Sequence, residues 1–331
     1  MARDRILVAD GHSDLLLELV FAEGQGEENP FRARWLDQLL AGDVALQVCA
    51  VYRDPDSNGG DGLREVLRQV HAFHAALEAN PDVLTVRTRR DLEHVRAGQV
   101  ALMLGIEGLS ALGSDLWPID LLAALGVRVV GPTWNERNAF ADGCDHDGGL
   151  TALGERLVDR LPELGMVVDL AHASPRTMVD FLERAPHGAV FVSHASCAAV
   201  HAHRRNLTDA QLTAIAEHGG VVGLMPHPLV VDPGQPTIDR FLDHVDHAVS
   251  VVGADRVGLG GDFLKQIAQA TGGARPTQDG VPVEAALAGL DGPGDYPRLV
   301  AALRARGYSD GDVEGIAGKN LLRFLARGPL P

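Results

Sequence analysis

The sequence predicts an α/β protein with a closed (β/α)8 barrel of the TIM type. Three observations support this prediction: eight short apolar runs recur along the chain, helical patterns separate them, and polar side chains follow several of the runs. The hydrophobicity of each run is continuous, which is typical of a strand covered on both faces in a parallel sheet wrapped by helices. The predicted strands are Ile6–Ala9, Val44–Val51, Val100–Ile106, Val127–Val130, Val167–Leu170, Ala189–Val192, Val221–Leu224 and Val257–Leu259.

The segments between these runs carry apolar residues at helical spacing, and several begin with Ser, Thr or Pro, which favour helix starts. The competing architecture is an open doubly wound sheet, which is expected to show a Gly-rich phosphate turn after its first strand. Here the first strand is followed instead by Gly11-His12-Ser13-Asp14. The predicted helices are Leu63–Ala79, Thr151–Leu164, Pro175–Arg184, Thr208–His218 and Thr237–Val252.

The domain organisation follows from the length of 331 residues, because barrels commonly use this much sequence for one domain. We expect a single barrel domain over 1–331, with 296–331 as a C-terminal helical extension packed on it. Two short helices are expected within Tyr296–Leu325. Two loops, Ala22–Pro30 and the Gly/Pro-rich stretch from about Thr271 to Pro297, are predicted to lie over the barrel mouth.

Composition limits the partners and the compartment. The formal charge of −16 would repel nucleic-acid phosphates and anionic lipids, so neither nucleic acid nor a membrane is an expected partner. The apolar run near the N-terminus is only a few residues long, unlike a signal peptide or a membrane span, and we therefore expect a cytoplasmic protein. Cys49, Cys144 and Cys197 are widely separated, which predicts free thiols rather than a disulfide framework or a zinc ribbon.

Potential ligands follow several predicted strands, and barrel enzymes keep their active sites at the C-terminal ends of the strands. His12 and Asp14 are two residues apart and can project from one face. Glu107 ends a very apolar strand, where an unpaired charge would be costly. His172 and His194 follow two later strands. Each residue alone has an ordinary structural explanation, but together they predict a site for two divalent ions with Glu107 as the bridge.

The ligand types indicate the chemistry. Imidazoles and carboxylates without thiolates suit zinc, and a pair of Zn²⁺ ions lowers the pKa of a bridging water toward neutrality, which favours hydrolysis. Asp262 follows the last predicted strand and is placed to carry a proton during the reaction. The alternative for Asp262 is a helix cap on the segment that follows it.

With these residues placed, the sequence resembles the membrane (renal) dipeptidase family of zinc peptidases over nearly its whole length. The resemblance rests on many ordered segments rather than on one motif. These segments are Asp10–Asp14, Gly105–Gly108, Gly148–Arg156, Leu164–His172, Ser193–Val200, His203–Asn206, Gly258–Phe263 and Gly318–Arg323.

The resemblance implies a role for each site residue. One zinc would be held by His12, Asp14 and Glu107, and the other by Glu107, His172 and His194, with a bridging water as nucleophile. Asp262 would pass a proton to the departing amine. Arg205 would pair with the terminal carboxylate of the substrate, and Trp134 and Asn135 would contact the substrate. The family cleaves dipeptides, commonly tolerates a D-residue on the C-terminal side and often forms dimers, which implies a small dipeptide-like substrate and a homodimer here.

The chain also departs from the family pattern. Trp134 stands where the best-known members have a histidine, and it resembles the Trp form of bacterial relatives. Leu264 and Lys265 replace a usual Asp and Gly after Phe263, and Lys319 replaces a Gly near the C-terminus. Because a Trp side chain cannot carry a positive charge, it would stabilise a developing oxyanion differently from a histidine.

The function predicted from these residues is zinc-dependent hydrolysis of the amide bond in a dipeptide or dipeptide-like molecule. Two alternatives remain at this stage. An amidohydrolase-like barrel could act on another amide, ester or lactone, although such barrels usually begin with His-x-His. A catalytically silent barrel could bind a ligand without turnover, because one fold hosts many functions.

Overall fold

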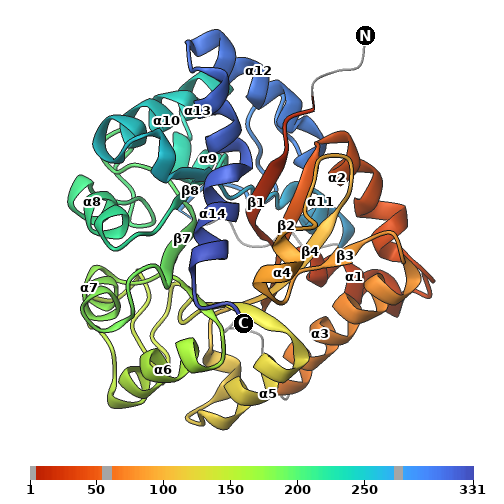
Figure 1. Cartoon of the computed structure of the whole chain (residues 1–331), viewed down its shortest axis with the longest axis vertical. Coiled ribbons are helices and arrows are strands. Elements are labelled where there is room, and N and C mark those ends of the chain that lie inside the picture. The colour runs from red at the N-terminus through yellow and green to blue at the C-terminus, as the bar shows by residue number, and fades with distance from the viewer. Residues whose placement is uncertain (1–4, 54–61, 272–278) are drawn as a thin grey trace.

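The computed structural model describes residues 5–53, 62–271 and 279–331 and shows a closed parallel β-barrel surrounded by helices (Figure 1). The sheet has nine strands in the order β2-β1-β9-β8-β7-β6-β5-β4-β3, and an additional pairing of β2 with β4 closes it. This confirms the predicted (β/α)8 fold. The strands are β1 Val8–Ser13, β2 Val44–Tyr52, β3 Leu84–Thr85, β4 Ala101–Glu107, β5 Val127–Gly131, β6 Val167–Asp169, β7 Val190–Ala195, β8 Val222–Leu224 and β9 Val257–Leu259.

Strand β3 is the one strand that the sequence pattern did not predict. It pairs only with Ala101 and Leu102, the first residues of β4, while β5 pairs with β4 from Leu104 onward. The two-residue strand β3 therefore pairs with the first residues of β4, which β5 leaves unpaired. Because β3 has only two residues, it shows no hydrophobic pattern in the sequence. The eight predicted runs correspond to the eight other strands, which form the closed barrel.

Helices cover the outside of the barrel, and their starts agree with the capping signals in the sequence. The side chains of Thr151, Ser174, Thr208 and Thr237 each accept a hydrogen bond from a backbone N–H in the first turn of the helix that follows. The helices are α1 Leu15–Gly24, α2 Asp37–Ala41, α3 Gly62–Ala79, α4 Arg89–Leu92, α5 Trp117–Leu125, α6 Ala152–Glu163, α7 Pro175–Arg184, α8 Asp209–Glu217, α9 Pro228–Val231, α10 Ile238–Val252, α11 Lys265–Ala270, α12 Tyr296–Arg306, α13 Asp310–Glu314 and α14 Asn320–Arg327.

The buried apolar residues form two main layers, because successive side chains on a strand point to opposite faces. On β2, Leu46 and Val48 belong to a smaller cluster inside the barrel, while Cys49 and Val51 belong to the larger layer between the barrel and the helices. The inner cluster also contains Leu321, Phe324 and Leu325 of α14. Helix α14 therefore packs against the inner residues of the strands, and Figure 1 shows it crossing the barrel near the C-terminus of the chain.

The C-terminal segment consists of α12 followed by a longer helical stretch. In that stretch a π-helical turn over Gly315–Lys319 joins α13 to α14, so the two predicted helices correspond to 296–306 and 310–327. The π turn lies against β1 and β9. A Cβ on Gly318 would lie only 2.5 Å from the backbone nitrogen of Ala9, so this close approach requires glycine. Lys319 points to Glu314 instead.

One of the two predicted mouth loops lies elsewhere. Residues Ala22–Gly24 still belong to α1, and the Asn29 side chain donates a hydrogen bond of 3.2 Å to Asn80, just beyond the end of α3. Because α3 follows β2 and runs back along the outside of the barrel, its end lies at the opposite face from the strand C-termini. The prediction that Ala22–Pro30 covers the mouth is therefore wrong.

The second predicted loop is described only in part, because 272–278 lie outside the described residues. Asp279 contacts His203 in the segment after β7, with 3.0 Å between Oδ2 and Nε2. The carbonyl of Val283 lies 3.2 Å from Nε2 of His227, after β8. Residues 279–283 thus lie at the C-terminal ends of the strands, as expected. Pro293–Asp295, in contrast, packs against α2 and Gly42 just before β2 begins, so this end of the predicted loop does not cover the mouth.

Two further sequence predictions concern the thiols and the membrane. Cys49, Cys144 and Cys197 are all free, which confirms the expectation from their spacing. Across the three described ranges, no helix combines the length and the apolar character that crossing a bilayer requires.

Candidate metal centre and active site

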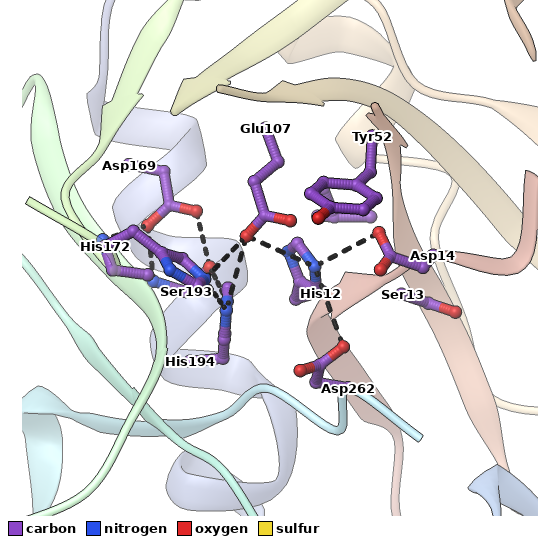
Figure 2. Close-up of polar contacts among 12 residues, drawn as sticks. His12, Ser13, Asp14, Tyr52, Glu107, Asp169, His172, Ser193, His194 and Asp262 are labelled. Atoms are coloured by element: carbon purple, nitrogen blue, oxygen red, sulfur yellow. Dashed lines mark hydrogen bonds and ion pairs between the residues drawn. The ribbon is translucent and has the colours of Figure 1, made fainter. Parts of the chain in front are cut away.

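The five predicted metal ligands converge at the C-terminal end of the barrel (Figure 2). Three of them lie within strands: His12 in β1, Glu107 as the last residue of β4 and His194 in β7. Asp14 directly follows β1, and His172 follows β6 by three residues. All five side chains are buried, with 1 to 7% of their surface exposed. Asp262, which follows β9, joins them and is equally buried.

Glu107 lies between three imidazoles. Its Oε1 atom is 2.9 Å from Nε2 of His172, 3.5 Å from Nε2 of His194 and 3.8 Å from Nε2 of His12. Despite these short distances, Oε1 receives no hydrogen bond with acceptable geometry. Three nitrogen atoms that point at one carboxylate oxygen without donating to it are an arrangement that a shared cation would satisfy.

His12 also faces a second pair of carboxylates. Its Nε2 atom is 3.6 Å from Oδ1 of Asp14 and 3.8 Å from Oδ1 of Asp262. Both oxygen atoms are buried and lack a hydrogen-bond donor. Because an unpaired carboxylate oxygen costs free energy when buried, this side of the site also fits a bound cation.

The distances sort the ligands differently from the predicted scheme. Two groups of three have all their ligand atoms within 4.8 Å of one another: His12 with Glu107 and His194, and His12 with Asp14 and Asp262. His172 lies outside both groups, and Asp262 lies inside one, although its predicted role is proton transfer. The donor set contains only imidazole and carboxylate groups, which fits the predicted zinc chemistry.

The clustered, buried carboxylates favour a bound proton or cation. Burial raises the pKa of Glu107 well above its ordinary value, and the charges of Asp14 and Asp262 raise it further against the opposing effect of His12. Burial also raises the pKa of Asp262 to about 6. For His12, burial favours the neutral ring, but Glu107 and the two aspartates outweigh it and raise its pKa to about 10.

The other two histidines have the opposite tendency. Burial lowers the pKa of His172 well below its ordinary value, and the charge of Arg205 lowers it further. Burial likewise lowers the pKa of His194, with a further contribution from His12. These two imidazoles are therefore neutral near pH 7, which is the protonation state that a metal ligand requires.

His194 is oriented by a short hydrogen-bonded chain. The hydroxyl of Ser193 lies 2.7 Å from Nδ1 of His194 and donates to Oδ2 of Asp169 at 2.5 Å. The other carboxylate oxygen of Asp169 accepts the backbone N–H groups of Ser193 and Ala171. Because the hydroxyl donates to Asp169, it accepts from an Nδ1–H group of His194. The unprotonated Nε2 atom is then free to face Glu107, and such supporting contacts orient metal-binding histidines.

His172 is oriented by a different chain. Its Nδ1 atom lies 2.7 Å from the side-chain oxygen of Asn135, which also accepts a contact of 3.1 Å from the Cys144 thiol. Asn135 is buried, so the structure places this predicted substrate-binding residue behind His172. Trp134 is partly exposed, with its ring centroid 6.0 Å from that of His172 and 5.6 Å from that of Tyr52. These aromatic rings form one wall of the site.

Arg205 reaches the same imidazole from the other side. Its Nη1 atom donates to the carbonyl of Ala171, and its Nη2 atom is 2.9 Å from Nε2 of His172. The guanidinium thus faces the nitrogen atom that a cation would use. Nε2 of His172 cannot contact Arg205 and bind a cation at the same time. In this structure the predicted substrate-binding arginine lies within the metal cluster.

The two departures after Phe263 lie next to Asp262. Leu264 and Lys265 line a small cavity of about 10 Å³ together with Asp262. Lys265 is turned toward Asp291, with 2.8 Å between Nζ and Oδ1. The two departures therefore lie in the wall beside the predicted proton carrier.

Sequence reasoning assigned no role to several residues that support the site: Asp10, Asp169, Ser193 and Tyr296. A signal for three of them was present, because Asp10, Asp169 and Ser193 are polar residues inside or at the end of otherwise apolar strands. A buried polar residue in such a strand needs a partner. Tyr296 gave no such signal, since its position in a C-terminal helix does not show what its hydroxyl reaches.

Comparisons with known proteins agree with this geometry. The family model of the membrane dipeptidases, peptidase family M19, matches residues 2–327. A dipeptidase of Clonostachys rogersoniana is 32% identical over 271 residues, which cover 80% of this chain and 65% of the relative. The chain thus spans less than two thirds of that relative. A dipeptidase of Aspergillus oryzae is 28% identical over 351 aligned positions, covering 97% of this chain and 78% of the relative.

A solved structure extends the agreement to three dimensions. The metallopeptidase of Rhodobacter sphaeroides, bound to a phosphinate mimic of the dipeptide L-Ala-D-Ala, superimposes with a TM-score of 0.83 and is 26% identical. The match covers 98% of this chain and 99% of that one. Because the family match spans nearly the whole sequence and the barrel is shared, this chain belongs to the membrane dipeptidase family of metallopeptidases, peptidase family M19.

Proposed function

We propose that the chain is a zinc-dependent dipeptidase that hydrolyses the amide bond of dipeptides or dipeptide-like molecules. One observation carries the proposal: Asp14, Glu107 and Asp262 each direct a buried carboxylate oxygen without a donor toward the imidazoles. A site that binds an uncharged ligand would leave these buried negative charges unbalanced, whereas bound cations would balance them.

In this proposal two zinc ions would be held by five residues, with Glu107 shared between the ions: His12, Asp14, Glu107, His172 and His194. When bound, the ions would acidify a water molecule and polarise the carbonyl of the scissile bond. Asp262 accepts the proton of the attacking water and delivers it to the leaving amine. Its buried position suits this role, because a carboxyl group with a pKa raised to about 6 can both take up and release a proton near neutral pH.

Arg205 and the aromatic wall would select the substrate. A guanidinium group fits a terminal carboxylate with two parallel hydrogen bonds, and in the proposed complex Arg205 turns from His172 to that carboxylate. Trp134, which is partly exposed and packs on the buried ring of Tyr52, offers a flat apolar surface beside His172. The Rhodobacter structure binds a mimic of L-Ala-D-Ala, which supports the proposal that a D-residue is tolerated on the C-terminal side here.

The test is hydrolysis of L-Ala-L-Ala, L-Ala-D-Ala and the C-terminal amide of L-Ala-D-Ala before and after metal removal. We expect chelation to abolish turnover and Zn²⁺ to restore it. The amide should be cleaved about 10- to 100-fold less efficiently in kcat/KM, because it lacks the charge that Arg205 would bind.

Three results would contradict the proposal in different ways. A folded chain that takes up no metal would remove the proposed centre. Two bound zinc ions without cleavage of any dipeptide would favour a ligand-binding barrel instead. Equal cleavage of the acid and the amide would remove Arg205 from carboxylate recognition while leaving the metal centre intact.

A further inference from the structure

We propose that Asp10 and Tyr296 form a positioning pair that holds the backbone of Asp262, and hence its carboxylate, in the orientation needed for proton transfer. The inference rests on the proposed function, in which Asp262 carries the proton. The hydrogen bonds of the two side chains go to the backbone of His12 and Gly261 and to each other, not to an imidazole of the metal centre. Both would act through Gly261 and Asp262.

Asp262 has an unusual backbone. Its φ angle is +40°, in the left-handed region that residues other than glycine seldom adopt. Such a conformation costs free energy and persists only where the surroundings impose it. The Oδ1 atom of Asp262 has no hydrogen-bond donor that could hold the side chain. Its direction toward His12 therefore depends on how the backbone of this segment is held.

Asp10 supplies that support. Its Oδ1 atom accepts the N–H of Gly261 at 2.8 Å and the N–H of His12 at 3.1 Å. The N–H of Asp262 in turn donates to the carbonyl of His12 at 3.2 Å. Regular pairing between β1 and β9 is limited to Asp10 with Leu259. Beyond this pair, the Asp10 carboxylate joins the two segments by accepting the N–H of Gly261. One buried side chain thus joins the segment of a metal ligand to the segment of the proton carrier.

Tyr296 completes the arrangement from a distant part of the chain. Tyr296 is the first residue of α12, and its side chain is fully buried. Its hydroxyl donates to the second oxygen of Asp10 at 2.7 Å. Its ring packs edge-on against Phe263, with 5.5 Å between the ring centroids. A Cβ on Gly261 would lie 2.6 Å from both Asp10 Oδ2 and the Tyr296 hydroxyl, so the segment before Asp262 fits closely against the pair.

Packing alone would require only the ring of Tyr296. The hydroxyl matters if it fixes the rotation of the Asp10 carboxylate, because the other oxygen can accept from Gly261 only in that rotation. Loss of the hydroxyl leaves a buried carboxylate oxygen unpaired, and the carboxylate is then expected to turn toward a new partner. Positioning and packing therefore predict different results for the change Tyr296→Phe.

The experiment compares Tyr296→Phe with Tyr308→Phe in the full chain reconstituted with Zn²⁺. Tyr308, in the turn between α12 and α13, is a matched control, because its hydroxyl also donates to an aspartate at 2.7 Å, that of Asp246 in α10. For Tyr296→Phe we expect kcat to fall about 10-fold with KM and zinc content within about twofold of the wild type. Amide hydrogen exchange in 259–263 should become faster. Tyr308→Phe should change none of these quantities.

A second pair of variants keeps the test decisive if Tyr296→Phe does not fold. Asp10→Asn preserves the shape and can still accept from Gly261 while donating to the Tyr296 oxygen, whereas Asp10→Ala loses both contacts. We expect Asp10→Asn to retain much more of kcat than Asp10→Ala. Equal losses for the two Asp10 variants would overturn the positioning role.

Other results would also overturn it. Unchanged kcat and exchange in Tyr296→Phe would show that only the ring is needed, and loss of zinc together with kcat would place the effect on the metal ligands. If the wild type binds zinc but cleaves no dipeptide, the proposed function fails by itself. The exchange rates in 259–263 would then still decide whether the Tyr296 hydroxyl holds this segment.

Discussion

The two sides of the metal centre present opposite chemistry to the same carboxylate. On the side of β1 and β9, His12 lies between Asp14 and Asp262, and Glu107 together with these two aspartates outweighs burial and raises the pKa of the ring to about 10. On the side of β6 and β7, His172 and His194 have no aspartate at Nε2, and burial lowers the pKa of both rings. The same residue type is thus driven toward the charged form on one side and the neutral form on the other.

This difference suggests a division of labour. The acidic side attracts a cation or a proton and contains the residue that we propose to move protons. The histidine side offers neutral ligands whose direction is set by Ser193 and Asn135. Glu107 lies between the two sides and contacts all three rings. We therefore expect changes on the acidic side to affect turnover most and changes behind the histidines to affect metal affinity most.

The largest expected effect tests the acidic side. Asp262→Asn should reduce kcat by about 100-fold or more while both zinc ions stay bound, because the amide cannot carry the proton. The measurement is kcat together with zinc content by elemental analysis, and Asp246→Asn on the outer helices is the control. Loss of one zinc ion in Asp262→Asn would instead make Asp262 a ligand, as the grouping of His12, Asp14 and Asp262 allows.

A smaller effect tests the histidine side. Ser193→Ala should weaken zinc binding by up to about 100-fold and Asn135→Ala by about 10-fold, because only the first chain ends in a carboxylate, that of Asp169. Zinc affinity would be measured by competition with a chelator of known affinity. Ser193→Thr keeps the hydroxyl and should restore binding. A large loss of kcat at full zinc occupancy in Ser193→Ala would contradict the division between the two sides.

The smallest effect concerns a histidine that is buried without acidic neighbours at its ring nitrogens. His244 accepts the N–H of Cys197 at Nδ1 and contacts the carbonyl of Val231 at Nε2, and burial lowers its pKa to about 4. Below pH 6.5 the unfolded chain binds a proton that the folded chain does not, so this group reduces stability as the pH falls toward 4.

The measurement for His244 is the free energy of unfolding at pH 7 and pH 5. Between these values the wild type should lose roughly 2 kcal/mol more than His244→Gln, which has no group to protonate. The same loss in both proteins would show that burial alone does not keep this ring neutral. The acidic neighbours of His12 would then not be enough to explain why its pKa differs from that of His244.

Much of the fold could be predicted because it depends on local patterns. Continuous apolar runs identified the eight barrel strands, and Thr151, Ser174, Thr208 and Thr237 marked helix starts that the structure shows. The position of Ala22–Pro30 could not be predicted in the same way. Its polar composition indicates a loop, but the end of the barrel at which it lies depends on where α1 ends.

For the site, the sequence by itself determined which residues could gather, because the strand ends of a barrel all meet at one face. The convergence of His12, Asp14, Glu107, His172, His194 and Asp262 follows from that rule. Only the tertiary structure decided what stands behind them: Asn135 at His172, Ser193 and Asp169 at His194, and Tyr296 at Asp10. Asp169 and Ser193 stand out in the sequence as polar residues of apolar strands, but the sequence does not show which partner each one meets. Most of these contacts join segments far apart in the sequence, so the pairing of the residues arises from packing in three dimensions.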